Sequence, residues 1–415
     1  MKAICIHHDS PLQLMPFGDS VGDLPILNQR LADHQRAVLE QCGVEIVEEP
    51  PSDESYIFFG EEVWFTETLI EELLRDIPDS GNGRLRCTDE LWNQHSSSVL
   101  STGDGIFRLG FCFGELPTDV SELPELEMDF QLRDGDPIDL HPKMAHALRP
   151  MRVGAMMAFE VKHWCDVLRV NQFAILEKFE RVKWQWSQSS FFAKCWTVIA
   201  TVFKVRSINP QTIARRIGTE GKNCKIHPTA VIEACEIGDN VEIGPYAVVR
   251  ASVIGDGAKI EEHATVNLSV LGPNSRAARY AMINLCVLME NAFVSRGGGF
   301  QMSLYGKGCF IAVDAVMLDL SFGKTIRVLD NDGQWVDSKQ HFVGCCIGHR
   351  AAIGNAVRLN YGVSVPNDAL LVANADELIF DASGAEPNVP ARVNDLHGVD
   401  VLNPKGLRDV FTDLD

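Results

Sequence analysis

The sequence predicts an α/β domain, then a helical linker, then a left-handed parallel β-helix. Three observations indicate this fold class. Strand-like and helix-like segments alternate over residues 1–150, and apolar residues at helical steps follow them. In the second half, aliphatic residues recur every six positions and glycine often comes next, which is typical of hexapeptide-repeat coils.

Residues 1–150 are predicted to form a small α/β domain. We expect strands over residues 3–6, 44–47, 56–59, 84–88 and 106–109. One helix is expected over residues 24–41, ended by Gly43, and another is expected from a Thr66 cap to about residue 77. Alternation of strands and helices favours a mainly parallel sheet. The acidic, proline-containing stretch 115–139 is expected to lack regular structure.

Residues 151–222 are predicted to form a helical linker. Apolar residues from Trp164 to Phe179 suit one face of a helix over 161–186, and a second helix is expected over 191–205. The basic run over 204–225 has two interpretations. It is either a solvated surface that balances the acidic N-terminal domain or a site for a phosphate or coenzyme tail.

Residues 223–384 carry the six-residue spacing. Val231, Ile237 and Ile243 fall six apart, and the spacing returns from Ile347 to Leu371. Each aliphatic residue is expected to point inward, and glycine permits a tight corner because it reaches positive φ without a Cβ clash. The alternative is an ordinary β-rich domain with accidental spacing.

Irregular steps add detail to this coil. The eleven residues from Leu271 to Met282 combine a face of six with a face of five. The polar stretch 330–340 is expected to be a loop or hairpin inserted near residues 326–343. Residues 385–415 lack the spacing and are predicted to form a tail that packs on an end coil.

Composition limits the classes of partner. The net charge of −20 disfavours nucleic acid and anionic membrane surfaces. No signal peptide is expected, and the most apolar window, 191–205, is too short to span a bilayer. Twelve cysteines without a Cys-x-x-Cys pair or zinc spacing favour free thiols in a reducing cytoplasm.

Several segments resemble sugar-1-phosphate nucleotidylyltransferases that carry a C-terminal hexapeptide-repeat domain, including the bifunctional branch that also acetylates the sugar. The segments that carry the resemblance are Leu24-Pro25-Ile26-Leu27 with the run to Gly43, Phe58-Phe59-Gly60-Glu61-Glu62, His163 to Leu168 with Asn171, residues 235–260, and residues 333–348. The resemblance implies a truncated nucleotidyltransferase-like N-terminal domain. It also implies a nucleotide sugar or sugar phosphate as ligand, Mg²⁺ and acetyl-CoA if the chain is active, and a homotrimer.

The family's first strand leads into a glycine-rich loop with an Arg and a Lys beside the phosphates. Here His7-His8-Asp9-Ser10-Pro11 follows the strand, and no Lys or Arg lies between Lys2 and Arg30. The site is therefore expected to be degenerate. Glu61 and Glu62 are the candidates for the acidic metal site, and His7, His8 and Asp9 could also hold a metal. Solvated polar turns are the alternative at both places.

An acyltransferase of this family uses a coil histidine as general base. Aligned with the family, that histidine would fall near Gly297–Phe300, where none is present. His341 is the best remaining candidate, His263 is a second, and His349 is a third. Structural histidines without a catalytic role are the alternative reading.

Two hypotheses of different class follow. The first is a transferase-like protein of sugar-nucleotide metabolism that either works by acyl or nucleotidyl transfer or has lost that activity. The second is a non-catalytic trimeric scaffold or sugar-nucleotide-binding sensor. In either case Val249, Val253 and Val270 are expected to face outward and to pack against the other subunits.

Overall fold

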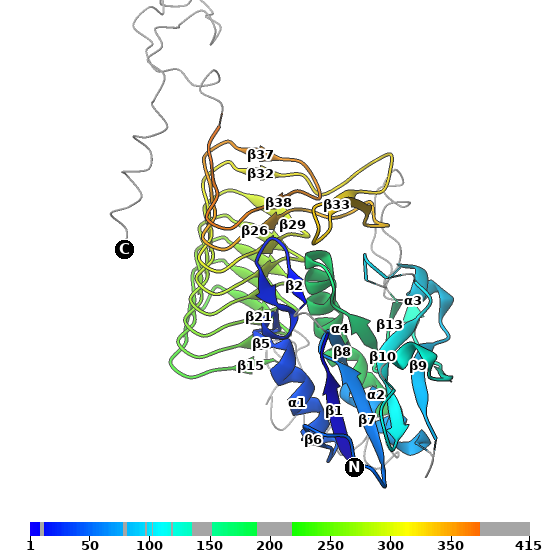
Figure 1. The fold of residues 1–415 in the computed structure, drawn as a ribbon. Coiled ribbons are helices and arrows are strands. Elements are labelled where there is room, and N and C mark those ends of the chain that lie inside the picture. The colour runs from blue at the N-terminus through cyan, green and yellow to red at the C-terminus, as the bar shows by residue number, and fades with distance from the viewer. Residues whose placement is uncertain are drawn as a thin grey trace, which may run out of the picture.

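The computed structural model describes residues 1–8, 12–77, 81–95, 98–101, 103–117, 119–134, 152–188 and 218–373. Figure 1 shows an α/β layer and a tall stack of parallel coils on either side of one long helix, α4 (Trp164–Gln188). The predicted fold class is confirmed: an N-terminal α/β region precedes a left-handed β-helix. The boundaries proposed at residues 150, 222 and 384 remain predictions.

A six-stranded sheet forms the centre of the N-terminal region. Its strands, in spatial order, are β11 (Glu125–Met128), β9 (Gly83–Cys87), β10 (Ile106–Phe113), β7 (Ser55–Gly60), β1 (Lys2–Ile6) and β6 (Glu45–Val47). The sheet is mixed, because β10 runs antiparallel to both β7 and β9 while the other pairs are parallel. The predicted mainly parallel sheet therefore holds for only part of it. The stretch 115–139 also contains a paired strand, β11, where none was expected.

The other N-terminal elements are short. They are the helices α1 (Leu31–Gln41), α2 (Glu67–Asp76) and α3 (Glu90–His95), the 3₁₀ turns Val21–Asp23 and Val120–Glu122, and the paired strands β2 (Gln13–Leu14) with β3 (Asp19–Ser20), β4 (Pro25–Ile26) with β5 (Gln29–Arg30), β8 (Val63–Phe65) with β14 (Ala158–Glu160), and β12 (Arg133–Asp134) with β13 (Arg152–Val153). Thr66 caps α2 as predicted, since its hydroxyl accepts from the Leu69 N–H. The helix predicted over 24–41 begins only at Leu31, because Leu27 and Asn28 have left-handed φ values of 51° and 66°.

The β-helix has three faces. One face consists of β15 (Thr219–Glu220), β18 (Glu236–Ile237), β21 (Val253–Ile254), β24 (Val270–Leu271), β27 (Val287–Leu288), β30 (Leu304–Tyr305), β35 (Cys346–Ile347) and β38 (Ser364–Val365). A second consists of β16 (Lys225–Ile226), β19 (Glu242–Ile243), β22 (Lys259–Ile260), β25 (Arg276–Ala277), β28 (Phe293–Val294), β31 (Phe310–Ile311), β36 (Ala352–Ile353) and β39 (Leu370–Leu371). The third consists of β17 (Val231–Glu233), β20 (Val248–Arg250), β23 (Thr265–Asn267), β26 (Met282–Asn284) and β29 (Gly299–Gln301), followed by β32 (Val316–Met317) and β37 (Arg358–Leu359).

Each regular coil is 17 residues long, so Ile237 pairs in register with Ile254 and Ile243 with Ile260. These side chains fill the interior, as predicted. On the third face, the residues predicted to point inward were the wrong ones. Val231 and Met282 are 39% and 59% exposed, and the neighbouring Ile232 and Ile283 point inward.

A hairpin of β33 (Arg327–Leu329) and β34 (Trp335–Asp337) projects from the β-helix where the polar stretch predicted a loop or hairpin. Figure 1 shows β33 extending from the coils toward the N-terminal layer. Ile326 and Val328 are fully buried in the same apolar cluster as α4. The hairpin is therefore packed against the rest of the chain.

The face of the β-helix that begins with β15 is covered by α4. Val253, Val270 and Val287 belong to the apolar cluster that contains α4, and Gln172 of that helix donates to the Leu285 carbonyl at 3.1 Å. The prediction that Val253 and Val270 face another subunit was wrong, because a helix of the same chain covers them. Val249 was also misplaced, since it is fully buried inside the coil.

Several predictions concern residues that lie outside the described ranges. These are Asp9, the helix over 191–205, most of the basic run over 204–225 and the tail 385–415. Within the described part of the chain, no helix combines the length and apolar character needed to cross a membrane. The eleven described cysteines are all free thiols.

Replacing Ile260 with alanine tests the interior of the coil. Ile260 is 1% exposed, so the variant leaves a cavity that neighbouring rungs cannot fill, and we expect it to lose about 2–5 kcal/mol of unfolding free energy. Urea denaturation followed by circular dichroism measures the loss. Lys259→Ala on the same strand is the control, and its surface ion pair with Glu242 predicts a loss below about 1 kcal/mol. Equal losses in both variants would contradict the assigned register.

Candidate active site at the carboxyl edge of the N-terminal sheet

Parallel strands β1 and β7 bring two pairs of polar residues to one edge of the sheet. Ile6 pairs with Gly60 at the ends of these strands. His7 and His8, which follow β1, therefore lie beside Glu61 and Glu62, which follow β7. This is the edge at which parallel sheets usually bind ligands. The structure therefore brings together the two N-terminal candidates that the sequence indicated separately.

The backbone of the turn that carries the two glutamates accepts hydrogen bonds from other elements. The buried side chain of Gln35 in α1 donates to the carbonyls of Gly60 at 3.1 Å and Val63 at 2.7 Å. Val161 donates its N–H to the Glu62 carbonyl at 2.8 Å. These bonds fix the backbone of the turn from which both carboxylates project.

Both glutamates already have partners. Arg108 of β10 donates to the two carboxylate oxygens of Glu62 at 3.1 and 3.3 Å, and it lies 2.8 Å from Nε2 of His8. His7 lies 2.7 Å from Glu61. Glu62 is fully buried, so pairing with Arg108 offsets the cost of removing its charge from water.

These residues fit Mg²⁺ poorly. Mg²⁺ needs free carboxylate oxygens in octahedral geometry. Here the carboxylate of Glu62 is already engaged in an ion pair with Arg108. Among the described residues, no group of three or more His, Cys, Asp or Glu side chains could hold a metal ion. The assignment of Glu61 and Glu62 to a metal remains a prediction, and no step is derived through one.

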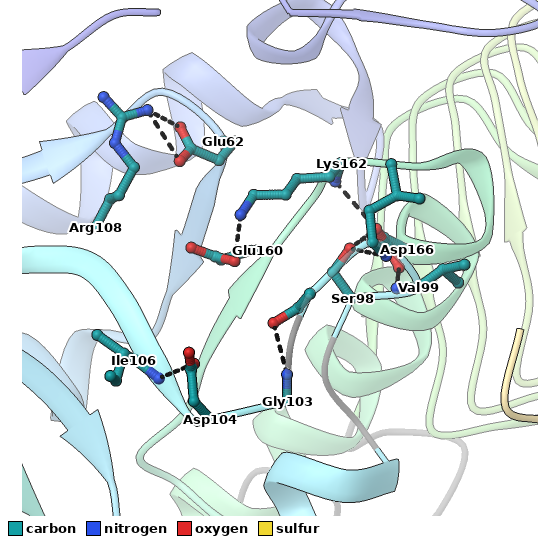
Figure 2. A network of polar contacts seen from close by, with 12 residues as sticks. Glu62, Ser98, Val99, Gly103, Asp104, Ile106, Arg108, Glu160, Lys162 and Asp166 are labelled. Carbon is teal, nitrogen blue, oxygen red and sulfur yellow. Dashed lines mark hydrogen bonds and ion pairs between the residues drawn. The ribbon is translucent and has the colours of Figure 1, made fainter. Parts of the chain in front are cut away.

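A second ion pair lies near the first. Figure 2 shows Glu62 with Arg108, Glu160 with Lys162, and Asp104 around one region of the sheet edge. Lys162 Nζ lies 2.6 Å from Glu160, which is 7% exposed. Burial raises the pKa of Glu160, the charge of Lys162 opposes that rise, and Glu62 and Asp104 add to it. We call these five residues the edge site.

Asp166 in the first turn of α4 holds the rim of the edge site. Its carboxylate accepts from the Ser98 hydroxyl, from the Val99 N–H at 3.1 Å and from the Lys162 N–H at 3.0 Å (Figure 2). Asp166 is fully buried. One carboxylate therefore ties the rim loop, the end of β14 and α4 together.

A small pocket opens beside Glu160. Its lining residues are Trp92, Asn93, Ser98, Ser101, Gly105, Ile106, Phe107, Ala158, Phe159 and Glu160. Asn93 donates to the Cys87 carbonyl at 2.8 Å, while its side-chain oxygen is buried and accepts from no described residue. Such an acceptor is costly unless a ligand or water donates to it. The pocket encloses only about 10 Å³, so it has room for about one water molecule, and a larger ligand would have to lie at its mouth.

Beyond His7 and His8, which stay at the sheet edge, the next described elements of the chain lie away from this site. The β2–β3 hairpin docks on the β-helix, where Asp19 accepts from His349 Nε2 at 3.1 Å and from Lys307 at 2.9 Å. The Phe17 ring packs on His349 with centroids 4.8 Å apart. The hydrogen bonds from His349 and Lys307, together with their charges, lower the pKa of Asp19 to about 2, although burial opposes the shift. This contact engages His349, the third histidine candidate, in a structural role.

The other two histidine candidates lie apart. His263 occupies an exposed corner between β22 and β23 with a φ of 60°, and its ring stacks between Tyr246 and Tyr280 at 5.1 and 5.0 Å. His341 lies between β34 and β35 and is half-buried, and its carbonyl accepts from the Ser321 N–H at 2.8 Å. Their catalytic roles remain predictions, as does the use of acetyl-CoA.

Sequence reasoning missed Arg108, Glu160, Lys162, Asn93 and Asp166. Only one local signal was available: Glu160 and Lys162 flank Val161 at the junction of a strand and a helix. The other three reach the site through tertiary contacts between elements far apart in the chain.

Comparisons with known proteins agree with the coil. Residues 208–317 match the family model described as the GMPPB C-terminal domain. No curated protein sequence matches the chain. One similar solved structure is titled "Crystallographic analysis of the polysialic acid O-acetyltransferase OatWY", with 19% identity over 37% of this chain and 73% of that chain. Its TM-score of 0.18 is too low to carry a conclusion.

Replacing Gly60 with alanine tests the packing at Glu62. A Cβ there would lie 2.6 Å from Glu62 Oε2, so the carboxylate must leave Arg108, and we expect a loss of about 1–3 kcal/mol of unfolding free energy. Adding Glu62→Gln to the Gly60→Ala variant should lower the unfolding free energy little further, because both changes remove the same ion pair. Gly323→Ala is the control, since a Cβ there meets nothing within 4 Å. Additive losses would contradict the proposed geometry.

Stability below pH 4 tests the hairpin contact. The pKa of Asp19 in the folded chain is about 2, against an ordinary 3.8, so its stabilisation is fully present above about pH 4 and is lost as the pH falls toward 2. Asp19→Asn should remove roughly 1–2 kcal/mol of this pH-dependent stability, a figure reduced for partial solvent exposure. Urea titrations at several pH values measure it, with the exposed Asp332→Asn as control. An unchanged pH slope in Asp19→Asn would refute the contact.

Proposed function

We propose that this chain, whose residues 208–317 match the family model described as the GMPPB C-terminal domain, is a transferase-related protein of sugar-nucleotide metabolism that binds the sugar of a nucleotide sugar or sugar phosphate at its edge site. The observation that carries the proposal is the buried carboxylate of Glu160 beside the unsatisfied Asn93 oxygen and the Trp92 and Phe159 rings. The pocket beside them holds about 10 Å³, so the sugar would lie at its mouth, and a hydroxyl group would reach the Asn93 oxygen through one water inside the pocket.

Charge at the edge site favours a sugar over a triphosphate. Glu62, Glu160 and Asp104 outnumber Arg108 and Lys162, and both cations are paired with carboxylates. A triphosphate needs free cations or a cradle of backbone N–H groups. The β2–β3 hairpin contacts the β-helix and supplies no cation to the edge site. These contacts support binding more than nucleotidyl transfer, and the non-catalytic sensor is the form of the proposal that they favour.

A homotrimer is part of the proposal. The face covered by α4 is unavailable to another subunit, so the two remaining faces of the β-helix would form the contacts. Light scattering should give three times the chain mass of 45.9 kDa, and a value near 45.9 kDa would contradict it. The free thiols suit a reducing compartment such as the cytoplasm.

Calorimetric titration tests the binding proposal. The ligand panel is UDP-, GDP- and dTDP-sugars, sugar 1-phosphates, and the nucleoside triphosphates alone. We expect the sugar-bearing ligands to bind and Glu160→Gln or Asn93→Ala to weaken binding about tenfold or more, because each removes a buried acceptor. Because the pKa of Glu160 is raised, binding should fail at a higher pH than for an ordinary glutamate as the medium is acidified.

Glu127→Gln is the matched control, since Glu127 is an exposed glutamate of the same domain. An assay for pyrophosphate release and one for acetyl transfer run on the same samples. Binding without turnover supports the sensor, and turnover that Glu160→Gln abolishes supports an active transferase. No binding by any sugar ligand to the folded protein would overturn the proposal.

A further inference from the structure

The β33–β34 hairpin belongs to the β-helix by sequence but contacts the rim of the edge site. The rim consists of residues 98–101 and the Glu160–Lys162 strand end. Lys339, just after β34, donates from Nζ to the Ser101 carbonyl at 3.2 Å. Asn331, in the hairpin turn, donates from Nδ2 to the Lys162 carbonyl at 3.0 Å. Two residues of the β-helix insertion thus reach both sides of the rim.

Each of these contacts acts on a residue that the edge site uses. Lys162 forms the ion pair with Glu160, and its backbone is held from two directions, since its N–H donates to Asp166 and its carbonyl accepts from Asn331. Ser101 lines the pocket, and its hydroxyl accepts from the Gly103 N–H. A shift of either backbone segment would move Lys162 or the pocket wall.

The hairpin itself is built to hold this position. Asp330 closes its turn by accepting from the N–H groups of Asp332 and Gln334 at 3.0 and 2.7 Å. The Leu329 carbonyl lies 2.9 Å from His163 Nε2, and Arg169 of α4 donates to the Ser338 carbonyl at 3.1 Å. The donors Asn331 and Lys339 therefore stand on a rigid support.

We propose that Asn331 and Lys339 are positioning residues of the edge site, through which the β-helix insertion sets the geometry of a ligand site in the N-terminal domain. The ligand named in this inference rests on the proposed function, whereas the positioning of the rim by Asn331 and Lys339 does not. It makes the two halves of the chain interdependent: the N-terminal domain alone would have a loosened rim.

The test uses the full chain and two readouts. Hydrogen exchange without ligand reports on the rim, and titration with the best-binding nucleotide sugar reports on the site. In the double variant Lys339→Ala/Asn331→Ala, hydrogen exchange over residues 98–106 and 160–163 should accelerate about threefold to tenfold. The affinity for the nucleotide sugar should fall by a similar factor. Exchange over coils 226–311 should not change, which shows that the protein remains folded.

Lys339→Arg alone is the conservative variant: an arginine can still donate to the Ser101 carbonyl, so both readouts should stay at their wild-type values. Lys324→Ala is the charge-matched control: this exposed lysine of the same insertion donates to no described residue of the rim. Unchanged rim exchange in the double variant, or equal effects of Lys324→Ala, would overturn the inference even if the wild type binds sugar. Accelerated exchange in a chain that binds no nucleotide sugar would instead sustain the positioning role and overturn only the proposed function.

Discussion

The packing of α4 between the sheet and the β-helix is the constraint on which the rest of the structure depends. Residues 164–175 of this helix are all buried, so it has apolar neighbours on every side. Buried polar groups are tolerated only when hydrogen-bonded. The four buried polar or charged residues within 164–175 each reach a different neighbour: Asp166 the rim loop, Arg169 the β33–β34 insertion, Asn171 the turn before β5, and Gln172 the coil.

This arrangement explains how a site can draw on elements so far apart in sequence. With α4 fixed on one face of the coils, the insertion lies over the rim and the β2–β3 hairpin lies over the corner at His349. These contacts hold the β2–β3 hairpin away from the sheet edge, while His7 and His8 remain there. Pairing of Arg108 with Glu62 then leaves the edge site short of the free cations that a triphosphate would need.

The sequence was most informative where the physics is local and repeated. Six-residue spacing predicted the coil, because each inward aliphatic residue stacks on its copy 17 residues later. Local spacing could not decide between adjacent aliphatic residues, so Val231 was placed inside instead of Ile232. It also could not show what covers an apolar face. Val253 and Val270 suited a subunit interface as well as they suit a helix of the same chain.

One of the five residues of the edge site, Glu62, was accessible to sequence reasoning, together with its neighbour Glu61. Glu61 and Glu62 follow a clear strand, and strand ends are where ligands bind. Arg108 comes from an antiparallel strand that the predicted mainly parallel sheet did not anticipate. Asn331 and Lys339 approach from an insertion in the other half of the chain, where only tertiary packing reveals a connection.

Differential scanning calorimetry of the full chain beside Val270→Asp tests most directly whether α4 joins the two halves into one body. Val270 is 1% exposed beneath the helix, and a charge there removes the contact without touching the interior of the coil. The account predicts one cooperative transition in the wild type and two in the variant. Two separate transitions already in the wild type would contradict it.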